Sequence, residues 1–268
     1  MQTLTLARTI ITLFFLSYAS WSDYKTREVS NSLWILFAPP ALALSLIELF
    51  LYEPMLLLPY VICFGLTSAF AITLFYLGAF GGADAKALMC LALALPFYPK
   101  NLSTPIAYEV SPISQFFFPI TVFSNSVLFA AAAAIYLFFR NVLSAYKTGT
   151  KLFEEDFRDE SRWKKLLVLM TGYKVSLEKL RDKWHLYPLE DVKTYSESEL
   201  KRILILMPRD EERNGIVDRL TEASRKGKIQ NFIWATPGLP MLIFTTMGLI
   251  AALFFGDIVW AFIRFLLE

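Results

Sequence analysis

Long apolar runs separated by short polar segments fill the first half of the chain and return at its C-terminal end. Most of them approach or exceed the roughly 18 to 20 residues that a helix needs to cross the hydrocarbon core of a bilayer. The pattern predicts six transmembrane helices, at about residues 3–21, 31–52, 54–78, 84–99, 117–139 and 239–266. The fourth apolar run is the shortest and contains Pro96, which interrupts helical hydrogen bonding.

A polar block interrupts this pattern at residues 140–236, where 20 of the 26 basic and 16 of the 24 acidic residues gather. Such a segment is water-soluble. Within it, residues 165–170 and 202–207 are apolar runs of strand length, and residues 208–227 have the pattern of a charged amphipathic helix. We therefore predict an α-helical polytopic membrane protein with about six transmembrane helices and a small α+β soluble domain inserted before the last helix. The predicted domains are transmembrane helices 1 to 5 in residues 1–140, the soluble domain in 141–236 and helix 6 in 237–268.

Composition agrees with a membrane protein, since only 19% of the residues are charged, below the roughly 25% of soluble proteins. The net charge of +2 gives no reason to expect a nucleic-acid partner. Cys63 and Cys90 each lie inside an apolar run, where we expect them to pack in the core, and His185 is the only histidine. These residues have no metal-ligand spacing and form no histidine-based triad, so no metal site and no cofactor are predicted.

Basic residues near the helix ends predict the orientation, because Lys and Arg favour the cytoplasmic side. With six crossings, nine of them fall on one face: Lys25, Arg27, Lys86, Arg140, Lys147, Lys151, Arg225, Lys226 and Lys228. The predicted location is the plasma membrane, with both termini outside and the soluble domain in the cytoplasm. The first 20 residues also have features of a secretory signal, but the polar segment 22–31 leads directly into another apolar run and favours a retained helix.

Acidic residues are scarce outside the polar block, and a carboxylate in or near a membrane is costly enough to need a reason. The eight are Asp23, Glu28, Glu48, Glu53, Asp84, Glu109, Asp257 and Glu268. Snorkelling or helix capping is the simplest account of Glu48 and Asp257, which lie near helix ends. Asp23 and Asp84 differ, because each follows an apolar helix and two crossings between them return the chain to the same face.

Two aspartates close together in a site of low dielectric constant cannot both ionise easily, so such a pair shares one proton. The ionised carboxylate can then activate water while the protonated one polarises a peptide carbonyl. Asp23 and Asp84 are accordingly the predicted catalytic pair. The backbone freedom of Gly78, Gly81 and Gly82 would support the pair, and Ala83 completes the segment that ends at Asp84. The simpler alternatives are a solvated turn residue for Asp23 and a helix cap for Asp84.

The segment Gly81-Gly82-Ala83-Asp84, with Asp23 preceding Val29-Ser30-Asn31, resembles the GxGD aspartic peptidases, specifically the prepilin peptidase group with its archaeal preflagellin peptidases. Two positions depart from the family pattern: Ala83 replaces the second motif glycine, and Ser30 stands where bacterial members often have proline. The cysteine-rich insert of bacterial relatives that also methylate their product is missing. The resemblance therefore implies peptidase activity alone.

By this resemblance, the substrates are membrane-anchored preflagellins or type IV pilin-like precursors, whose short basic leader is cut at the cytoplasmic membrane face. The soluble domain, on the same face, would guide the leader. Lys86 is a candidate for tuning the aspartates, and Glu28 for contacting a basic leader. The lipid bilayer is the other expected partner, and nothing in the sequence indicates an oligomeric state.

Two other classes remain open. In a proton-coupled transporter or channel the same carboxylates would line an ion pathway, but such proteins place polar groups near the membrane midplane and often contain inverted repeats, which this sequence does not display. A membrane scaffold would use the soluble domain to bind a cytoplasmic partner. Separation of Asp23 and Asp84 by more than about 12 Å, beyond direct charge coupling, would favour either class.

Overall fold

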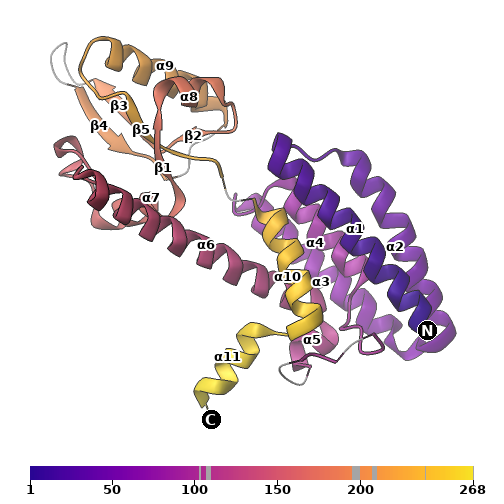
Figure 1. Ribbon diagram of the computed structural model, residues 1–268. Helices are drawn as coiled ribbons and strands as arrows, with labels where there is room; N and C mark the ends of the chain where they lie inside the picture. The colour runs from indigo at the N-terminus through magenta and orange to yellow at the C-terminus, as the bar shows by residue number, and fades with distance from the viewer. Residues whose placement is uncertain (103, 107–109, 195–199, 207–209, 239, 268) are drawn as a thin grey trace. The chain divides into compact units, whose positions relative to one another are not determined.

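The computed structural model describes residues 1–102, 104–106, 110–194, 200–206, 210–238 and 240–267. The chain divides into two compact units (Figure 1). The helical unit contains Met1–Ala130 and Pro240–Glu268, and the sheet-containing unit contains Ala131–Leu239.

The described part of the helical unit is mostly helical. Its helical elements are α1 (Gln2–Thr26), α2 (Asn31–Tyr52), the 3-10 turn η1 (Pro54–Leu56), α3 (Leu57–Tyr76), α4 (Gly82–Ala94), α5 (Pro112–Phe116), the first part of α6 (Phe118–Thr148), α10 (Met241–Phe255) and α11 (Ile258–Leu267). Among the described residues, four helical segments are long and apolar enough to cross a membrane: α1, α2, η1 with α3, and α6. The bent pair of α10 and α11 makes a fifth if it is one span. The chain is therefore a helical membrane protein, while six spans are not confirmed.

Two predicted spans differ from their expected form. Helix α4 has 13 residues and ends at Ala94, two residues before Pro96, which cannot donate the backbone hydrogen bond that would continue the helix. At 1.5 Å per residue it is roughly 20 Å long, short of the roughly 30 Å hydrocarbon core. The predicted last helix is broken between α10 and α11 with a bend of 56°. Gly256 makes this break, because its positive φ of 76° leaves the right-handed helical region.

The first four helices pack side by side in the helical unit (Figure 1). Helix α1 contacts α2, α4 and α10, and α4 also contacts α2 and α3. Fully buried side chains such as Leu16, Phe37 and Leu91 form the shared core. Cys63 and Cys90 are buried and unbonded to each other, as predicted. Many outward-facing residues are also apolar and exposed, as expected for a surface that meets lipid.

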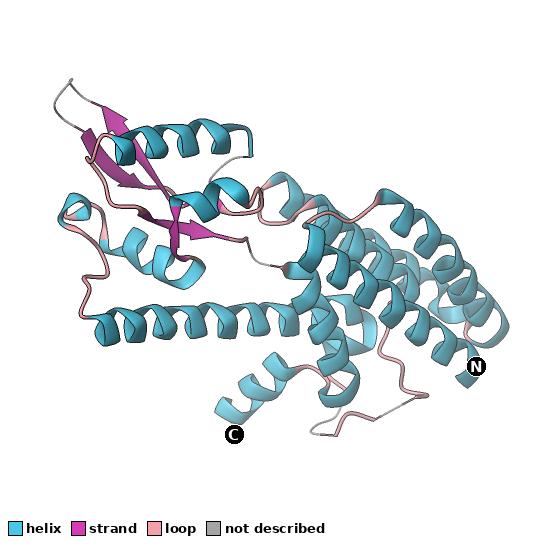
Figure 2. Cartoon of the chain, turned by 45° about the horizontal axis from the view of Figure 1, so that its top comes forward, coloured by secondary structure: helices cyan, strands magenta, loops and turns pink. Residues whose placement is uncertain are grey.

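The sheet-containing unit has two small antiparallel sheets covered by helices (Figure 2). One sheet has the order β1 (Tyr173–Ser176), β5 (Phe232–Thr236) and β2 (Tyr187–Pro188), and the other pairs β3 (Glu190–Thr194) with β4 (Leu200–Leu204). The other elements are the end of α6, the 3-10 turn η2 (Glu155–Phe157), α7 (Arg162–Thr171), α8 (Leu177–Asp182) and α9 (Asp210–Arg225). Helix α9 packs the buried residues Ile216 and Leu220 into the core of this unit.

The detailed predictions for this unit have mixed outcomes. The helix predicted at 208–227 is confirmed as α9, and the run 202–207 overlaps β4 as far as Leu204, while Met207 lies outside the described residues. The strand predicted at 165–170 is wrong, because these residues belong to α7. The Ser161 hydroxyl caps α7 by accepting the Lys164 N–H at 3.2 Å. With Val168 and Leu169 buried on one face, α7 is an amphipathic helix, and a six-residue apolar run does not distinguish this from a buried strand.

Buried polar contacts fix the sheet-containing unit. Arg202, with a side chain 1% exposed, donates to Glu190 Oε2 from Nη2 at 2.8 Å and from Nε at 3.2 Å. The other Glu190 oxygen accepts the Trp234 N–H at 2.8 Å. Near the end of α6, the buried Asn141 amide donates to the carbonyl oxygens of Leu169 at 2.9 Å and Gly172 at 2.7 Å. These bonds join β3, β4 and β5 to one another and α6 to α7.

Candidate active site

Asp23 lies in the last turn of α1 and is half-buried. The turn closes at Arg27, whose φ of 56° is left-handed and whose backbone N–H donates to the Asp23 carbonyl at 2.9 Å. The chain leaves this helix end through a short loop. In the loop the Glu28 carbonyl accepts the hydroxyl hydrogen bonds of Ser22, at 2.8 Å, and Thr26, at 3.0 Å. Asp23 is therefore held on a helix end with a structured connection, and not in a free turn.

Asp84 lies in the first turn of α4 and is also half-buried. Its Oδ2 accepts the Gly81 N–H at 3.0 Å, and Gly81 is its one hydrogen-bond donor among the described residues. A Cβ at Gly81 would stand 3.1 Å from Asp84 Oδ2, closer than such contacts usually are. The glycine therefore lets the carboxylate fold back over the start of the helix. Asp84 thus makes a capping contact, as the simpler alternative for this residue proposed, and Oδ1 stays available for other chemistry.

The two aspartates lie at the same end of the helical unit. Because short connections join the first four helices, consecutive helices run in opposite directions, so the end of α1 and the start of α4 share one end (Figure 1). Helices α1 and α4 contact each other directly. The fold thus brings together two carboxylates that are 61 residues apart in the sequence.

Lys86 and Glu28 do not contact the aspartates through any described ion pair. The exposed Lys86 ammonium donates to Asn31 Oδ1 at 2.6 Å, which joins the start of α4 to the first residue of α2. Sequence reasoning missed this role of Asn31, because nothing in the pattern pairs two polar residues 55 positions apart. The Glu28 side chain is exposed. Ser30, the departure from the family proline, accepts the Ser32 N–H at 3.3 Å and caps α2.

The other scarce carboxylates have separate roles. Asp257 caps α11, as predicted, because its Oδ1 accepts the Trp260 N–H at 3.0 Å, and its Oδ2 accepts the Ser111 hydroxyl at 3.0 Å. Glu48 does not snorkel: it is 4% exposed and forms an ion pair with Arg8 at 2.9 Å. Glu109 and Glu268 lie outside the described residues. In the described part of the chain, no three His, Cys, Asp or Glu side chains cluster as a metal site would require.

Comparison with known proteins places this architecture among leader peptidases. Residues 10–135 match the model of the type IV leader peptidase family, and residues 164–258 match the model described as the archaeal peptidase A24 C-terminus type II. The first match covers both aspartates. The second covers most of the sheet-containing unit together with α10.

Individual relatives extend the similarity over nearly the whole chain. The preflagellin peptidase of Methanococcus voltae is 30% identical over 254 residues, covering 92% of this chain and 94% of that protein. The preflagellin peptidase of Methanococcus maripaludis strain C6 is 24% identical over 253 residues, with the same coverage. A third, from Methanocaldococcus jannaschii, is 30% identical over 138 residues, covering 50% of this chain and 57% of that protein.

The fold and these matches define a helical membrane peptidase of the class that removes leader peptides. Within that class, the chain belongs to the archaeal preflagellin peptidase family.

Proposed function

We propose that this protein is a membrane-embedded aspartic endopeptidase that removes the short basic leader from preflagellin or type IV pilin-like precursors. The observation that carries the proposal is the placement of Asp23 and Asp84 at one end of the helical unit, on two helices that contact each other. Membership in the preflagellin peptidase family supports the substrate class.

The chemistry follows from two carboxyl groups in a half-buried site. Repulsion between two negative charges favours a state in which the pair holds a single proton. The ionised carboxylate accepts a proton from water as the water oxygen attacks the scissile carbonyl, while the protonated carboxyl group donates a hydrogen bond to the carbonyl oxygen. Proton transfer to the leaving amine then completes hydrolysis and restores the shared proton. The roles are assigned to the pair, because coupled groups titrate together.

The site's position at helix ends suits a substrate that is itself anchored in the membrane. The peptide bond to be cut lies where the substrate's apolar helix meets its basic leader, at the membrane boundary. Basic residues beside the site, Lys25, Arg27 and Lys86, favour the cytoplasmic side. We therefore assign the active site and the sheet-containing unit to the cytoplasmic face, with residues 1–140 and 237–268 as the membrane domain and 141–236 as the soluble domain.

The transporter alternative receives less support from the geometry. An ion pathway needs polar groups near the middle of the membrane. Asp23 and Asp84 instead occupy the last turn of one helix and the first turn of another. This placement exposes them to a substrate at the membrane boundary.

The test is cleavage of a leader-bearing preflagellin precursor by the full-length protein in lipid nanodiscs. Asp23→Asn and Asp84→Asn keep the shape of each side chain but remove its ability to ionise. Each should lower the cleavage rate at least about a thousandfold, within the range of lost acid–base catalysis. Glu53→Gln is the matched control, because it removes a carboxylate of the helical unit just after α2, at the end opposite the two aspartates. Wild-type cleavage by either aspartate variant would refute the dyad.

A further inference from the structure

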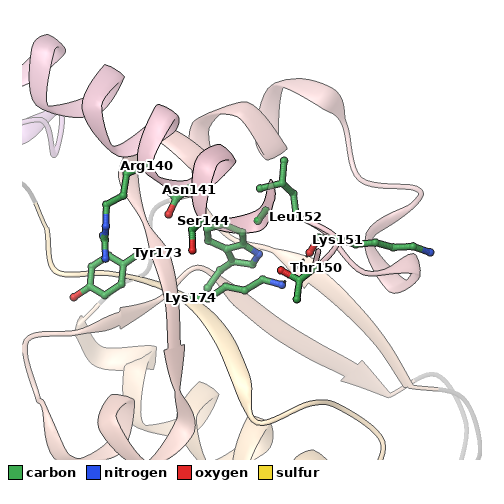
Figure 3. Close-up of a pocket in the computed structure, with 10 residues that line it drawn as sticks. Arg140, Asn141, Ser144, Thr150, Lys151, Leu152, Tyr173 and Lys174 are labelled. Carbon is green, nitrogen blue, oxygen red and sulfur yellow. Dashed lines mark hydrogen bonds between the residues drawn. The ribbon is translucent and has the colours of Figure 1, made fainter. Parts of the chain in front are cut away.

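A small pocket lies in the sheet-containing unit beside the end of α6 (Figure 3). Its volume is about 120 Å³, and residues of α6, of the segment that follows α6, of β1 and of β5 line it. This volume corresponds to roughly four water molecules at about 30 Å³ each, which is enough to hold a phosphate group. The pocket lies within residues 140–234 and shares no lining residue with the proposed active site.

Two cations flank the pocket, each held over an aromatic ring. The Arg140 guanidinium lies 5.4 Å from the centre of the Tyr173 ring, and no carboxylate pairs with it among the described residues. The Lys174 ammonium lies 5.7 Å from the centre of the Trp234 ring. Lys174 also donates to the Lys151 carbonyl at 3.4 Å and stands 3.7 Å from Glu154 Oε1, so only part of its donor capacity is used.

Neutral donors complete the lining. The Ser144 side chain lies between the two cations in Figure 3, and no hydrogen bond to its hydroxyl is formed within the described structure. Thr150 already shares a hydrogen bond of 2.7 Å with Thr148. The Lys151 side chain points away from the pocket and pairs with Glu155 at 3.0 Å. No acidic residue lines the pocket. It therefore presents one unpaired guanidinium, one ammonium and one hydroxyl, a donor set suited to an anion with several oxygens.

The position of Arg140 along α6 relates this pocket to the bilayer. Helix α6 is a candidate span of 31 residues that begins at Phe118. At 1.5 Å per residue, about 20 residues cross a hydrocarbon core of roughly 30 Å, which brings the helix to about Phe138. Arg140 and Ser144 therefore lie just beyond the hydrocarbon, at the depth where lipid headgroups carry their phosphates.

We propose that this pocket binds the phosphate group of a membrane lipid. Arg140 donates two parallel hydrogen bonds to the phosphate oxygens, Lys174 supplies a second positive charge and Ser144 a further donor. Free inorganic phosphate has the same chemistry, but the depth of Arg140 favours the lipid-borne group. A basic leader is repelled by these cations, so the pocket is not where the substrate leader binds. The bound lipid fastens the base of the sheet-containing unit to the membrane surface.

The test measures lipid binding to the full-length protein in detergent micelles by native mass spectrometry. Phosphatidylglycerol is titrated beside a galactosyl diacylglycerol, which has a similar apolar anchor but no phosphate. The pocket variant is Arg140→Gln with Lys174→Gln. The matched control is Lys179→Gln with Lys193→Gln, which removes the same charge from exposed positions of the same unit. Ser144→Asp is a second pocket variant, which keeps both cations and adds one negative charge at an exposed helical position.

Wild type and control should bind phosphatidylglycerol equally and the galactolipid weakly. Both pocket variants should bind phosphatidylglycerol at least about tenfold more weakly, the scale of a lost charge-assisted contact, with unchanged thermal unfolding. Equal phosphatidylglycerol affinity in wild type and both pocket variants would overturn the proposal. The proposal would also be overturned if inorganic phosphate bound the pocket without lipid and displaced phosphatidylglycerol at millimolar concentration. The phosphate group that occupies the pocket would then come from the free ion and not from a lipid.

Discussion

The ion pair between Arg8 and Glu48 offers a sharp test of how the helical unit is held together. Their side chains are 10% and 6% exposed, and Arg8 Nη2 lies 2.9 Å from Glu48 Oε2. Arg8 Nη1 also donates to the carbonyl of Ala94 at 3.0 Å, at the end of α4. Glu48 Oε1 accepts the Thr5 hydroxyl at 2.7 Å. The pair therefore connects α1, α2 and α4 at the end opposite the two aspartates.

Glu48→Gln removes the negative charge with little change of shape and leaves the Arg8 cation buried without its counter-charge. Breaking a buried pair in this way costs about 3–5 kcal/mol. A cavity of about 240 Å³, lined in part by both residues, lets water approach, so the low end of the range is expected. Replacing both residues by apolar ones of similar size, Arg8→Met with Glu48→Leu, removes both buried charges. The double variant should lie within about 2 kcal/mol of wild type, because apolar replacements of buried pairs are often close to neutral.

Reversible unfolding in mixed micelles of increasing SDS content measures these free energies. The Arg8→Met and Glu48→Gln single variants should each unfold at lower SDS than wild type. The Arg8→Met/Glu48→Leu double variant should be more stable than the sum of the Arg8→Met and Glu48→Leu single effects predicts, by at least about 2 kcal/mol. Wild-type stability of Glu48→Gln, or strict additivity in that cycle, would refute the argument that the pair is buried and coupled.

Three other substitutions test separate contacts. Gly248→Ala should lower the thermal stability of the nanodisc-embedded protein by about 1–3 kcal/mol through overpacking, because its Cβ would meet Ser126 Oγ and stand 2.6 Å from the Val122 carbonyl oxygen. The control is Met247→Ala at an exposed position, and equal melting temperatures of the two variants would contradict the close approach at Gly248. Gly81→Ala should slow leader cleavage about tenfold while leaving the melting temperature unchanged, because the added Cβ would displace the Asp84 carboxylate. An unaltered cleavage rate would show that the position of this carboxylate beside Gly81 does not matter for cleavage. Asn141→Leu should destabilise the sheet-containing unit by about 1–3 kcal/mol, because two buried carbonyl groups lose their hydrogen-bond donor. Hydrogen exchange of the α7 amides measures this loss, and unchanged protection of α7 would contradict the prediction.

The membrane character and the candidate chemistry follow directly from residue order. Apolar runs long enough to span a membrane can be identified without tertiary structure, because the bilayer itself requires about 20 apolar residues per helix. The scarcity of carboxylates outside the polar block pointed to Asp23 and Asp84 for the same reason, since a charge near lipid is costly. The left-handed conformation of Arg27 and the serine helix caps also involve only residues that are close in sequence.

Other features depended on contacts between distant segments. The helical state of residues 165–170 could not be read from a short apolar run, because a buried strand and one face of α7 have the same composition. The pairing of Glu48 with Arg8 and of Lys86 with Asn31 joins positions 40 and 55 residues apart, which only helix packing brings together. The sequence by itself thus determined where the chain meets lipid and which carboxylates need an explanation. The tertiary structure decided which charges pair and which cations surround a pocket, because these depend on distances between elements that local patterns do not encode.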